Sequence, residues 1–232
     1  AAAASAKSSR SSITSAAGFH AGDPLVMQRT VALCKQSGVA VGAHPGFPDL
    51  QGFGRRQMKL TPAEAKACVQ YQIGALKAFC DAAGVPLHHV KPHGALYNMA
   101  GKDRALADAI CAAVKESAPG AVLLALSGSE MVKAAQAISL PVANEVFADR
   151  GYRPDGSLVP RGTPGAMIED EDEAIARVIR MVTEGKVTAN DGTDIAIQAD
   201  SVCVHGDGPK ALAFVEKIGA ALQAAGVELK AF

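Results

Sequence analysis

The fold is decided by residues 87–128, LHHVKPHGALYNMAGKDRALADAICAAVKESAPGAVLLALSG. Two segments are strand candidates, LHHVKPH over 87–93 and the apolar run over 121–128, and they flank a helical pattern over 103–117. The second run is almost wholly apolar, as expected for a strand that is buried on both faces of a sheet. This order of strand, helix and strand predicts two parallel strands joined by a helix that covers the sheet.

The same alternation extends from this unit toward both ends of the chain. We expect further strands over 39–44, 141–149 and 200–207, and further helices over 24–37, 61–84, 130–138, 170–183 and 209–225. The clearest helix begins at Thr61, because Thr61 and Glu64 match a capping box with Pro62 in the first turn.

Two architectures fit this order of elements, an open doubly wound sheet and a barrel. All strands of a barrel end at one mouth, whereas an open sheet gathers polar groups mainly at its switch point. Polar motifs follow several different strands here, which favours the barrel. The predicted fold class is α/β, a single-domain parallel (β/α) barrel, for which an irregular or seven-stranded form is allowed.

The composition excludes two classes of partner. Lys+Arg and Asp+Glu number 23 each among 232 residues, so no net charge is available to attract nucleic acid or an anionic membrane. No apolar run reaches the length of about 18 residues that a membrane-spanning helix needs. The five cysteines occur singly inside apolar stretches, which predicts reduced thiols. Because no signal-peptide pattern opens the sequence either, the expected location is the cytoplasm. Residues 1–12 are a low-complexity Ala/Ser segment, which leaves 13–232 as the domain.

Five short motifs place histidines or acids beside glycine and proline just after apolar runs. They are GFHAGDP (18–24), GAHPGFPD (42–49), VKPHGALYN (90–98), EVFADRGYRPDG (145–156) and VCVHGD (202–207). Glycine allows a loop to approach a ligand closely, and loops at strand ends carry many binding and catalytic residues. We therefore expect the five motifs to meet in one active site.

The second and third motifs supply the first candidates. His44 is a candidate base, although a histidine at a strand end is often structural. Lys91 and His93 should point to the same side of the sheet and form a candidate catalytic pair. A lysine in a barrel interior needs an acid or a ligand as its partner. Arg55 and Arg56 either hold a carboxylate or phosphate or form a solvated surface pair.

The remaining motifs supply a second group of candidates. Glu145 is a candidate general base, and Arg150 either binds substrate or forms a structural ion pair with Asp149. Asp207 is a candidate catalytic acid, the cap of the final helix, or both. Asn98 is a candidate for binding substrate or phosphate.

Histidines that follow different strands are also candidate metal ligands. Imidazoles and carboxylates that converge can bind a divalent metal ion that activates water. The candidate ligands are His20, His44, His93 and His205. No H-E-x-x-H motif occurs, so a metal site depends on convergence in the fold.

Taken together, the motifs closely resemble the LamB/YcsF family of lactam utilisation proteins, the A subunits of prokaryotic 5-oxoprolinase. The resemblance begins at about residue 13 and includes GAHPGFPDLQGFGRR (42–56) and YQIGAL (71–76). It implies a barrel related to the glycoside hydrolase and metal-dependent deacetylase barrels. It also implies hydrolysis of the 5-oxoproline lactam to glutamate, with ATP and Mg²⁺ and together with B and C subunits. We assign His44, Lys91, His93, Glu145 and Asp207 to the catalytic centre of that reaction.

The chain departs from the family at its beginning. Family members open with a strand that bears Asp-Leu-Asn-x-Asp, and they read roughly Ser-Ala-Asn-Ile-Ala-Cys before Gly-Phe-His, where this chain has Ser15, Ala16 and Ala17. We therefore expect the first strand and part of the second to be absent. Two other functions stay open: a metal-dependent deacetylase or amidase that acts alone, and a non-catalytic subunit that binds substrate.

Overall fold

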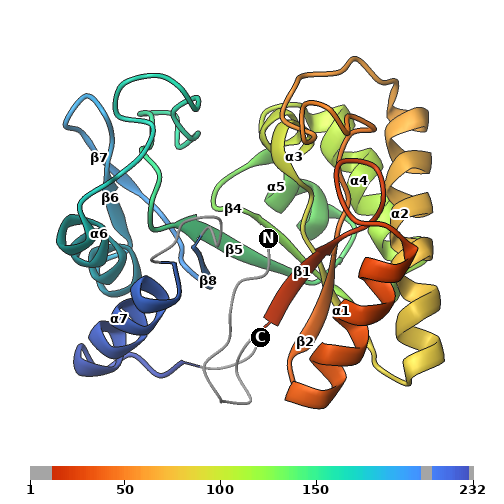
Figure 1. Cartoon of the computed structure of the whole chain (residues 1–232). Helices are drawn as coiled ribbons and strands as arrows, with labels where there is room; N and C mark the ends of the chain where they lie inside the picture. Colours follow the sequence, from red (N-terminus) through yellow and green to blue (C-terminus); the bar gives the residue numbers. More distant parts are fainter. Residues whose placement is uncertain (1–11, 205–210, 230–232) are drawn as a thin grey trace.

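Six parallel strands form a curled half-barrel sheet through the middle of the molecule (Figure 1). The computed structural model describes residues 12–204 and 211–229. The strands, in their order across the sheet, are β1 (Ser12–Ala16), β2 (Ala40–His44), β3 (Leu87–Val90), β4 (Val122–Leu126), β5 (Val142–Phe147) and β8 (Ser201–Cys203). Every pairing in this sheet is parallel, so all six carboxyl ends lie at one edge. The prediction of a parallel α/β barrel class is confirmed.

Helices cover the sheet in two groups (Figure 1). The helices are α1 (Pro24–Ser37), α2 (Pro62–Ala83), α3 (Gly94–Ala100), α4 (Arg104–Ser117), α5 (Glu130–Ala137), α6 (Glu171–Thr183) and α7 (Ala211–Ala224). Consecutive members of the series α1, α2, α4 and α5 pack side by side against the main core, whereas α6 and α7 pack together near β8 around a smaller cluster. None of the described helices is long and apolar enough to cross a membrane.

Local signals explain why α2 forms where the sequence predicts it. The Thr61 hydroxyl accepts a hydrogen bond from the Glu64 backbone, and the Glu64 carboxylate accepts one from the Thr61 backbone at 2.7 Å. Gly84 ends the helix in the left-handed conformation, with φ of 66°, which costs glycine little. The face that α2 buries includes Ile73 and Leu76, both fully inaccessible. Capping and apolar spacing thus agree along this helix.

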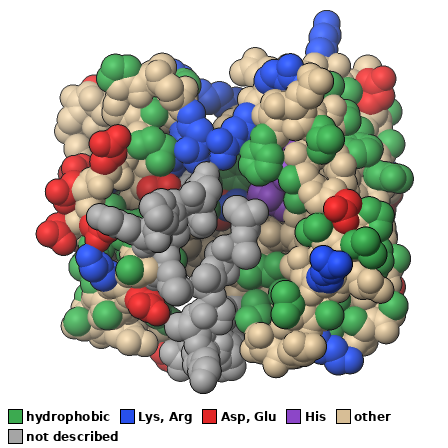
Figure 2. Space-filling view, viewed as in Figure 1, with side chains coloured by type: hydrophobic (Ala, Val, Ile, Leu, Met, Phe, Trp, Pro, Cys, Tyr) green, Lys and Arg blue, Asp and Glu red, His purple; other side chains and the backbone are tan. Residues whose placement is uncertain are grey.

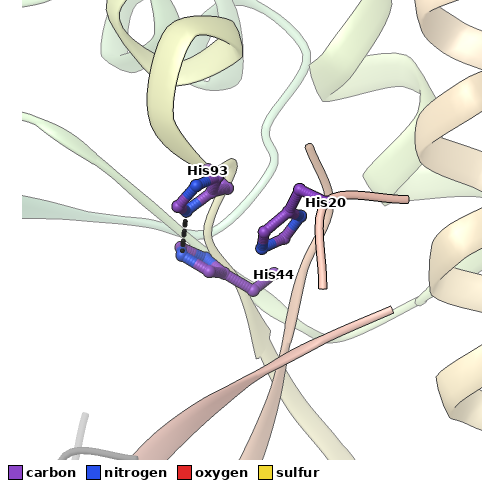
Figure 3. Close-up of side chains that lie close together, drawn as sticks. All are labelled: His20, His44 and His93. Carbon is purple, nitrogen blue, oxygen red and sulfur yellow. Dashed lines mark hydrogen bonds between the residues drawn. The ribbon is translucent and has the colours of Figure 1, made fainter. Parts of the chain in front are cut away.

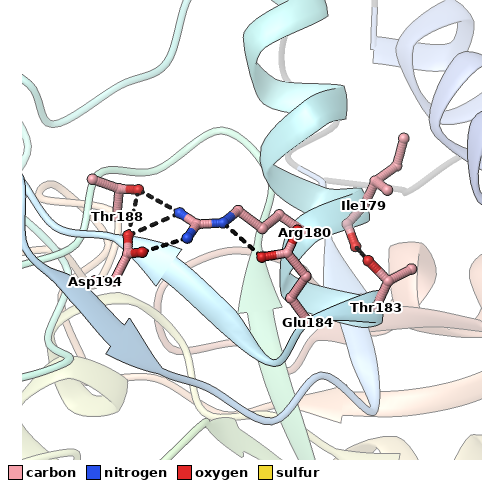
Figure 4. Close-up of polar contacts among 6 residues, drawn as sticks. All are labelled: Ile179, Arg180, Thr183, Glu184, Thr188 and Asp194. Carbon is pink, nitrogen blue, oxygen red and sulfur yellow. Dashed lines mark hydrogen bonds and ion pairs between the residues drawn. The ribbon is translucent and has the colours of Figure 1, made fainter.

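A short hairpin that the sequence did not predict packs beside α6. Its strands are β6 (Lys186–Thr188) and β7 (Asp194–Ala196), which pair antiparallel. Figure 4 shows Arg180 of α6 binding Asp194 and the Thr188 hydroxyl, with a 2.8 Å distance from Nη1 to each oxygen. The hairpin is therefore fastened by side chains that approach one another only in the folded chain.

Two other differences from the sequence-based expectation concern the site, and two predicted site residues stay untested. Strand β1 runs over Ser12–Ala16, and each of these residues pairs with β2, where we expected part of the strand to be absent. Helix α3 follows β3 directly and was not predicted. His205 and Asp207 lie outside the residues that the structure describes.

Candidate functional site

The carboxyl ends of the strands surround a cavity of about 1090 Å³. Figure 2 shows this hollow between the two halves of the molecule, with histidine on its wall and Lys and Arg side chains at its upper rim. Its lining includes these sequence-predicted residues: His20, His44, Arg55, Lys91, His93, Asn98, Glu145 and Arg150. Parallel strands end at one edge, so loops that are distant in the sequence meet there.

Backbone pairing beyond β3 sets the direction of two of these side chains. The N–H groups of Lys91 and His93 donate to the carbonyls of Ala43 and Pro45, at 2.9 and 2.8 Å. This continues the contact between β2 and β3 past the last strand residue. The alternation of a strand then directs Lys91 and His93 into the same cavity, as predicted.

A buried ion pair lies in the cavity wall. Lys91 Nζ is 2.6 Å from Glu145 Oε1, and the two side chains are 14% and 2% exposed. The other carboxylate oxygen of Glu145 accepts a hydrogen bond from the Tyr97 hydroxyl at 2.8 Å. Lys91 Nζ also donates to Cys203 Sγ at 3.1 Å. The expectation that an acid partners Lys91 is confirmed, and the acid is Glu145.

The charges in this network are set by burial and by Glu145. Burial alone disfavours the charged form of Lys91, but the adjacent Glu145 carboxylate outweighs burial and raises the pKa of Lys91, with Cys203 Sγ as a further hydrogen-bond acceptor. Burial raises the pKa of Cys203 to about 12, so this thiol is neutral at pH 7. Burial and the Glu145 charge raise the pKa of Tyr97, which keeps its phenol protonated. The network is therefore a lysine cation, a carboxylate and two neutral hydrogen-bonding groups.

Three histidines form a second cluster in the same cavity (Figure 3). One nitrogen from each of His20, His44 and His93 lies within 4.8 Å of the others. His93 Nδ1 is 2.9 Å from His44 Nε2, and the rings of His20 and His93 stack with centroids 3.9 Å apart. His20 Nδ1 is buried, and it has no hydrogen-bond partner among the described residues.

Burial is the main reason why these histidines resist protonation. It lowers the pKa of His20 to about 3 and that of His93 to about 4. The pKa of His44 falls well below its ordinary value, through burial and the neighbouring His93 and Lys91. All three are neutral at pH 7, and so each ring has one nitrogen lone pair available.

The loop after β2 supports this cluster from one side. Asp49 accepts hydrogen bonds from the Arg56 guanidinium, with Oδ1 2.9 Å from Nε, and fixes the loop. Within it Phe53 has φ of 53°, the left-handed region that non-glycine residues seldom adopt. Its carbonyl accepts a hydrogen bond from His93 Nε2 at 2.7 Å. A side chain at Gly54 would place its Cβ 2.9 Å from both His20 Cβ and His93 Cδ2.

Arg55 and Arg56 are adjacent in sequence but differ in surroundings. Arg56 forms its ion pair with Asp49, and its side chain is 64% exposed. It is not among the residues that line the cavity, so its observed role is to hold the loop. Arg55 lines the cavity, with its guanidinium carbon 5.3 Å from the centre of the Phe53 ring.

Arg150 has a structural role as a donor to backbone carbonyls, in addition to lining the cavity. Its buried guanidinium donates to the carbonyls of Ala166 and Val159, at 3.0 and 2.5 Å. These bonds tie the beginning of the loop that follows β5 to its middle and to its later part. Burial lowers the pKa of Arg150 to about 10, so it is still charged at pH 7. Asn98 is exposed on α3 and lines the cavity.

Tyr97 and Cys203 are site residues that were not among the predicted ones. Both belong to quoted motifs, VKPHGALYN and VCVHGD, but neither residue type by itself indicated a contact with Lys91 or Glu145. Their position in the sequence could have identified them, because each lies in a motif that follows or ends a strand.

Known proteins share this fold and sequence. The A subunit of 5-oxoprolinase from Clostridium beijerinckii is 63% identical over 219 residues, which cover 94% of this chain and 86% of that protein. The Bacillus subtilis protein of the same name is 56% identical over 216 residues, 93% and 84% of the two chains. The crystal structure of the lactam utilization protein from Thermus thermophilus is 51% identical, has a TM-score of 0.87, and matches 96% of this chain and 89% of that chain. The LamB/YcsF profile matches residues 9–232, and the chain therefore belongs to the LamB/YcsF family.

Proposed function

We propose that this chain is the A subunit of a 5-oxoprolinase, which opens the 5-oxoproline lactam to glutamate with hydrolysis of ATP. The observation that carries the proposal is the match, over 93–95% of this chain, to relatives that are named as the A subunit of 5-oxoprolinase. We further propose B and C subunits as its partners, and ATP with Mg²⁺ as the cosubstrate.

Coupling to ATP fits the chemistry of the substrate. A lactam is an unreactive amide, and its hydrolysis near neutral pH is unfavourable. Transfer of the γ-phosphoryl group of ATP to the amide oxygen would release ADP and create a good leaving group. Water then adds to the ring carbon, and the C–N bond of this adduct breaks as the nitrogen takes a proton, which leaves an acyl phosphate. A second water hydrolyses the acyl phosphate to the carboxylate of glutamate and inorganic phosphate. This sequence requires a base for water and a positive group near the developing negative charge.

The ion-pair network of Lys91, Glu145 and Tyr97 is suited to provide the positive group near the developing negative charge. Lys91 presents a cation at the cavity, and Glu145 and Tyr97 hold it in one position. We propose that Lys91 binds the amide oxygen or the phosphate that replaces it, and that Arg55 and Asn98 bind the substrate carboxylate. A cation fixed in place before the substrate arrives stabilises developing charge without reorganising during the reaction.

The pair of His44 and His93 is suited to provide the base that takes a proton from water. His44 and His93 are neutral and line the same cavity as Lys91, so either can accept a proton from water. We propose this pair as the general base. Its low proton affinity keeps it in the accepting form throughout the physiological pH range.

Reconstitution with the B and C subunits tests the function. The complete complex should form glutamate and ADP from 5-oxoproline and ATP, and Lys91→Ala should reduce turnover at least about 100-fold, the scale typical of losing one group that stabilises a transition-state charge. A complete, folded complex that forms no glutamate would refute the proposal. Near-normal turnover with Lys91→Ala would instead indicate a non-catalytic subunit that positions substrate.

The histidine cluster favours one second candidate, a metal-dependent amidase or deacetylase that acts alone. Three imidazoles in a cavity are a common ligand set of catalytic zinc. The zinc-loaded chain without partners should then hydrolyse amides. If only the three-subunit complex with ATP is active, this candidate fails.

A further inference from the structure

The hydrogen bonds of two histidines determine where their protons are. His44 Nδ1 lies 2.6 Å from the Lys91 carbonyl, and His93 Nε2 lies 2.7 Å from the Phe53 carbonyl. A carbonyl oxygen can only accept, so each of these nitrogens must carry the hydrogen. In the neutral rings the other nitrogens, Nε2 of His44 and Nδ1 of His93, then have lone pairs and no hydrogen.

These two bare nitrogens point at each other. They are only 2.9 Å apart, which is a hydrogen-bond distance with no hydrogen available to the neutral pair. Two facing lone pairs repel unless a positive species lies between or beside them. The candidates are a shared proton and a metal ion.

The third ring distinguishes the two candidates. A proton shared by His44 and His93 would leave His20 without any role, although its Nδ1 is buried without a hydrogen-bond partner among the described residues. His20 is 2% exposed and stacks directly on His93. A metal ion would use a nitrogen from all three rings, whereas a shared proton uses two.

We propose that His20, His44 and His93 bind one divalent transition-metal ion, with zinc as the ion that best fits three imidazoles. Backbone carbonyls already set the tautomers of His44 and His93, which is how proteins usually orient histidine ligands. Two nitrogens at about 2.1 Å from a tetrahedral zinc are about 3.4 Å apart, so the 2.9 Å pair must open only slightly. This inference does not depend on the proposed 5-oxoprolinase activity, but it changes the base proposed for it. An ion at this place would occupy the lone pairs of His44 and His93, and a water activated by the ion would then replace the free imidazoles as the source of the base.

The stacked geometry predicts which ring must turn. A metal ion lies in the plane of each imidazole that binds it, and the His20 and His93 planes are 5° from parallel at 3.9 Å. One of them has to rotate. His93 is held by the Phe53 carbonyl, whereas His20 Nδ1 has no hydrogen bond among the described residues, so His20 is the ring that turns. When bound, the ion would act as a Lewis acid toward an oxygen atom of a ligand in the cavity.

The test measures metal binding rather than turnover. The untagged full chain is stripped with a chelator and titrated with zinc by calorimetry, with elemental analysis of the loaded protein. We expect one ion per chain. Changing a group that only orients a metal ligand typically weakens metal binding about 10–100-fold. Because His44 and His93 are proposed as ligands themselves, His44→Ala and His93→Gln should each weaken zinc binding by more than this. Loading the wild-type chain with cobalt should give the visible absorption bands of a cobalt ion bound by nitrogen atoms. Both variants should lose these bands.

His88→Gln provides the matched control. His88 also lies in the sheet but is not part of the three-histidine cluster, so this variant should retain one ion per chain. Circular dichroism establishes that each variant is folded, and ring-nitrogen NMR shifts of the wild-type chain on adding zinc test the ligands without mutation. Binding of less than about 0.1 ion per wild-type chain, unchanged ring signals, or equal losses with His88→Gln would each overturn the proposal.

Discussion

Removing Glu145 should destabilise the chain far more than removing the acid of an exposed ion pair whose nitrogen–oxygen distance is the same. Glu145→Ala leaves the Lys91 ammonium in a site where it is 14% exposed, with the Cys203 sulfur still in contact with it. Breaking one side of a buried ion pair typically costs about 3–5 kcal/mol, because the other charge remains desolvated. The Tyr97 hydroxyl loses its acceptor as well. We expect the free energy of unfolding in urea to fall by about 3–5 kcal/mol.

Glu116→Ala is the control, because Lys66 and Glu116 are also 2.6 Å apart but are 34% and 52% exposed. An exposed pair contributes about 0–1 kcal/mol, so this variant should change little. The double variant Lys91→Met, Glu145→Ala removes both charges and should be more stable than Glu145→Ala alone. The reasoning is refuted if Glu145→Ala costs no more than Glu116→Ala, or if the double variant is less stable than the single one.

Three further predictions concern the surroundings of the site. Gly46→Ala would place a Cβ 2.7 Å from His20 Nδ1, so we expect a loss of about 1–3 kcal/mol in urea unfolding and weaker zinc binding in titration. The hydrogen bond from Arg56 lowers the pKa of Asp49 to about 2, below the unfolded value of about 3.9. Its stabilisation is therefore complete above pH 4 and lost as the pH falls from about 4 to about 2, and Asp49→Asn should remove this part of the acid dependence seen in thermal unfolding. Lys91→Met should abolish glutamate formation by the complex yet retain zinc binding, because the carbonyl that holds His44 belongs to the backbone.

The sequence predicted those elements whose signals are local. The capping box of Thr61 and Glu64 fixes the start of α2, and the nearly continuous apolar run of β4 marks a strand buried on both faces. Strand β1 was absent from the strands that hydrophobic periodicity predicted, because its inward positions include only one large apolar residue, Ile13, beside a small Ser15. The hairpin was missed because its strands have three residues each and depend on Arg180, which belongs to another element.

The location of the site was also predictable, but the partners within it were not. Glycine and proline after apolar runs indicated which loops would meet, and burial indicated that Lys91 needed an acid. Which acid it would be depended on the sheet order, because Glu145 is 54 residues away. The different surroundings of Arg55 and Arg56 were not predictable either, because they depend on which of the two lies near Asp49 and which lines the cavity in the folded loop.

Lys91 connects the two polar clusters of the cavity through different atoms. Its side chain binds Glu145, while its carbonyl accepts the hydrogen bond that orients His44. A small shift of the chain after β3 would therefore move the cation and the imidazole together. The strand pairing of Lys91 and His93 with the β2 segment opposes such a shift, since both backbone N–H groups are bound. The parallel sheet thus fixes the distance between a permanent positive charge and a cluster of neutral imidazoles. That spacing is what a reaction needs when it must neutralise an oxygen and accept a proton at neighbouring points of one substrate.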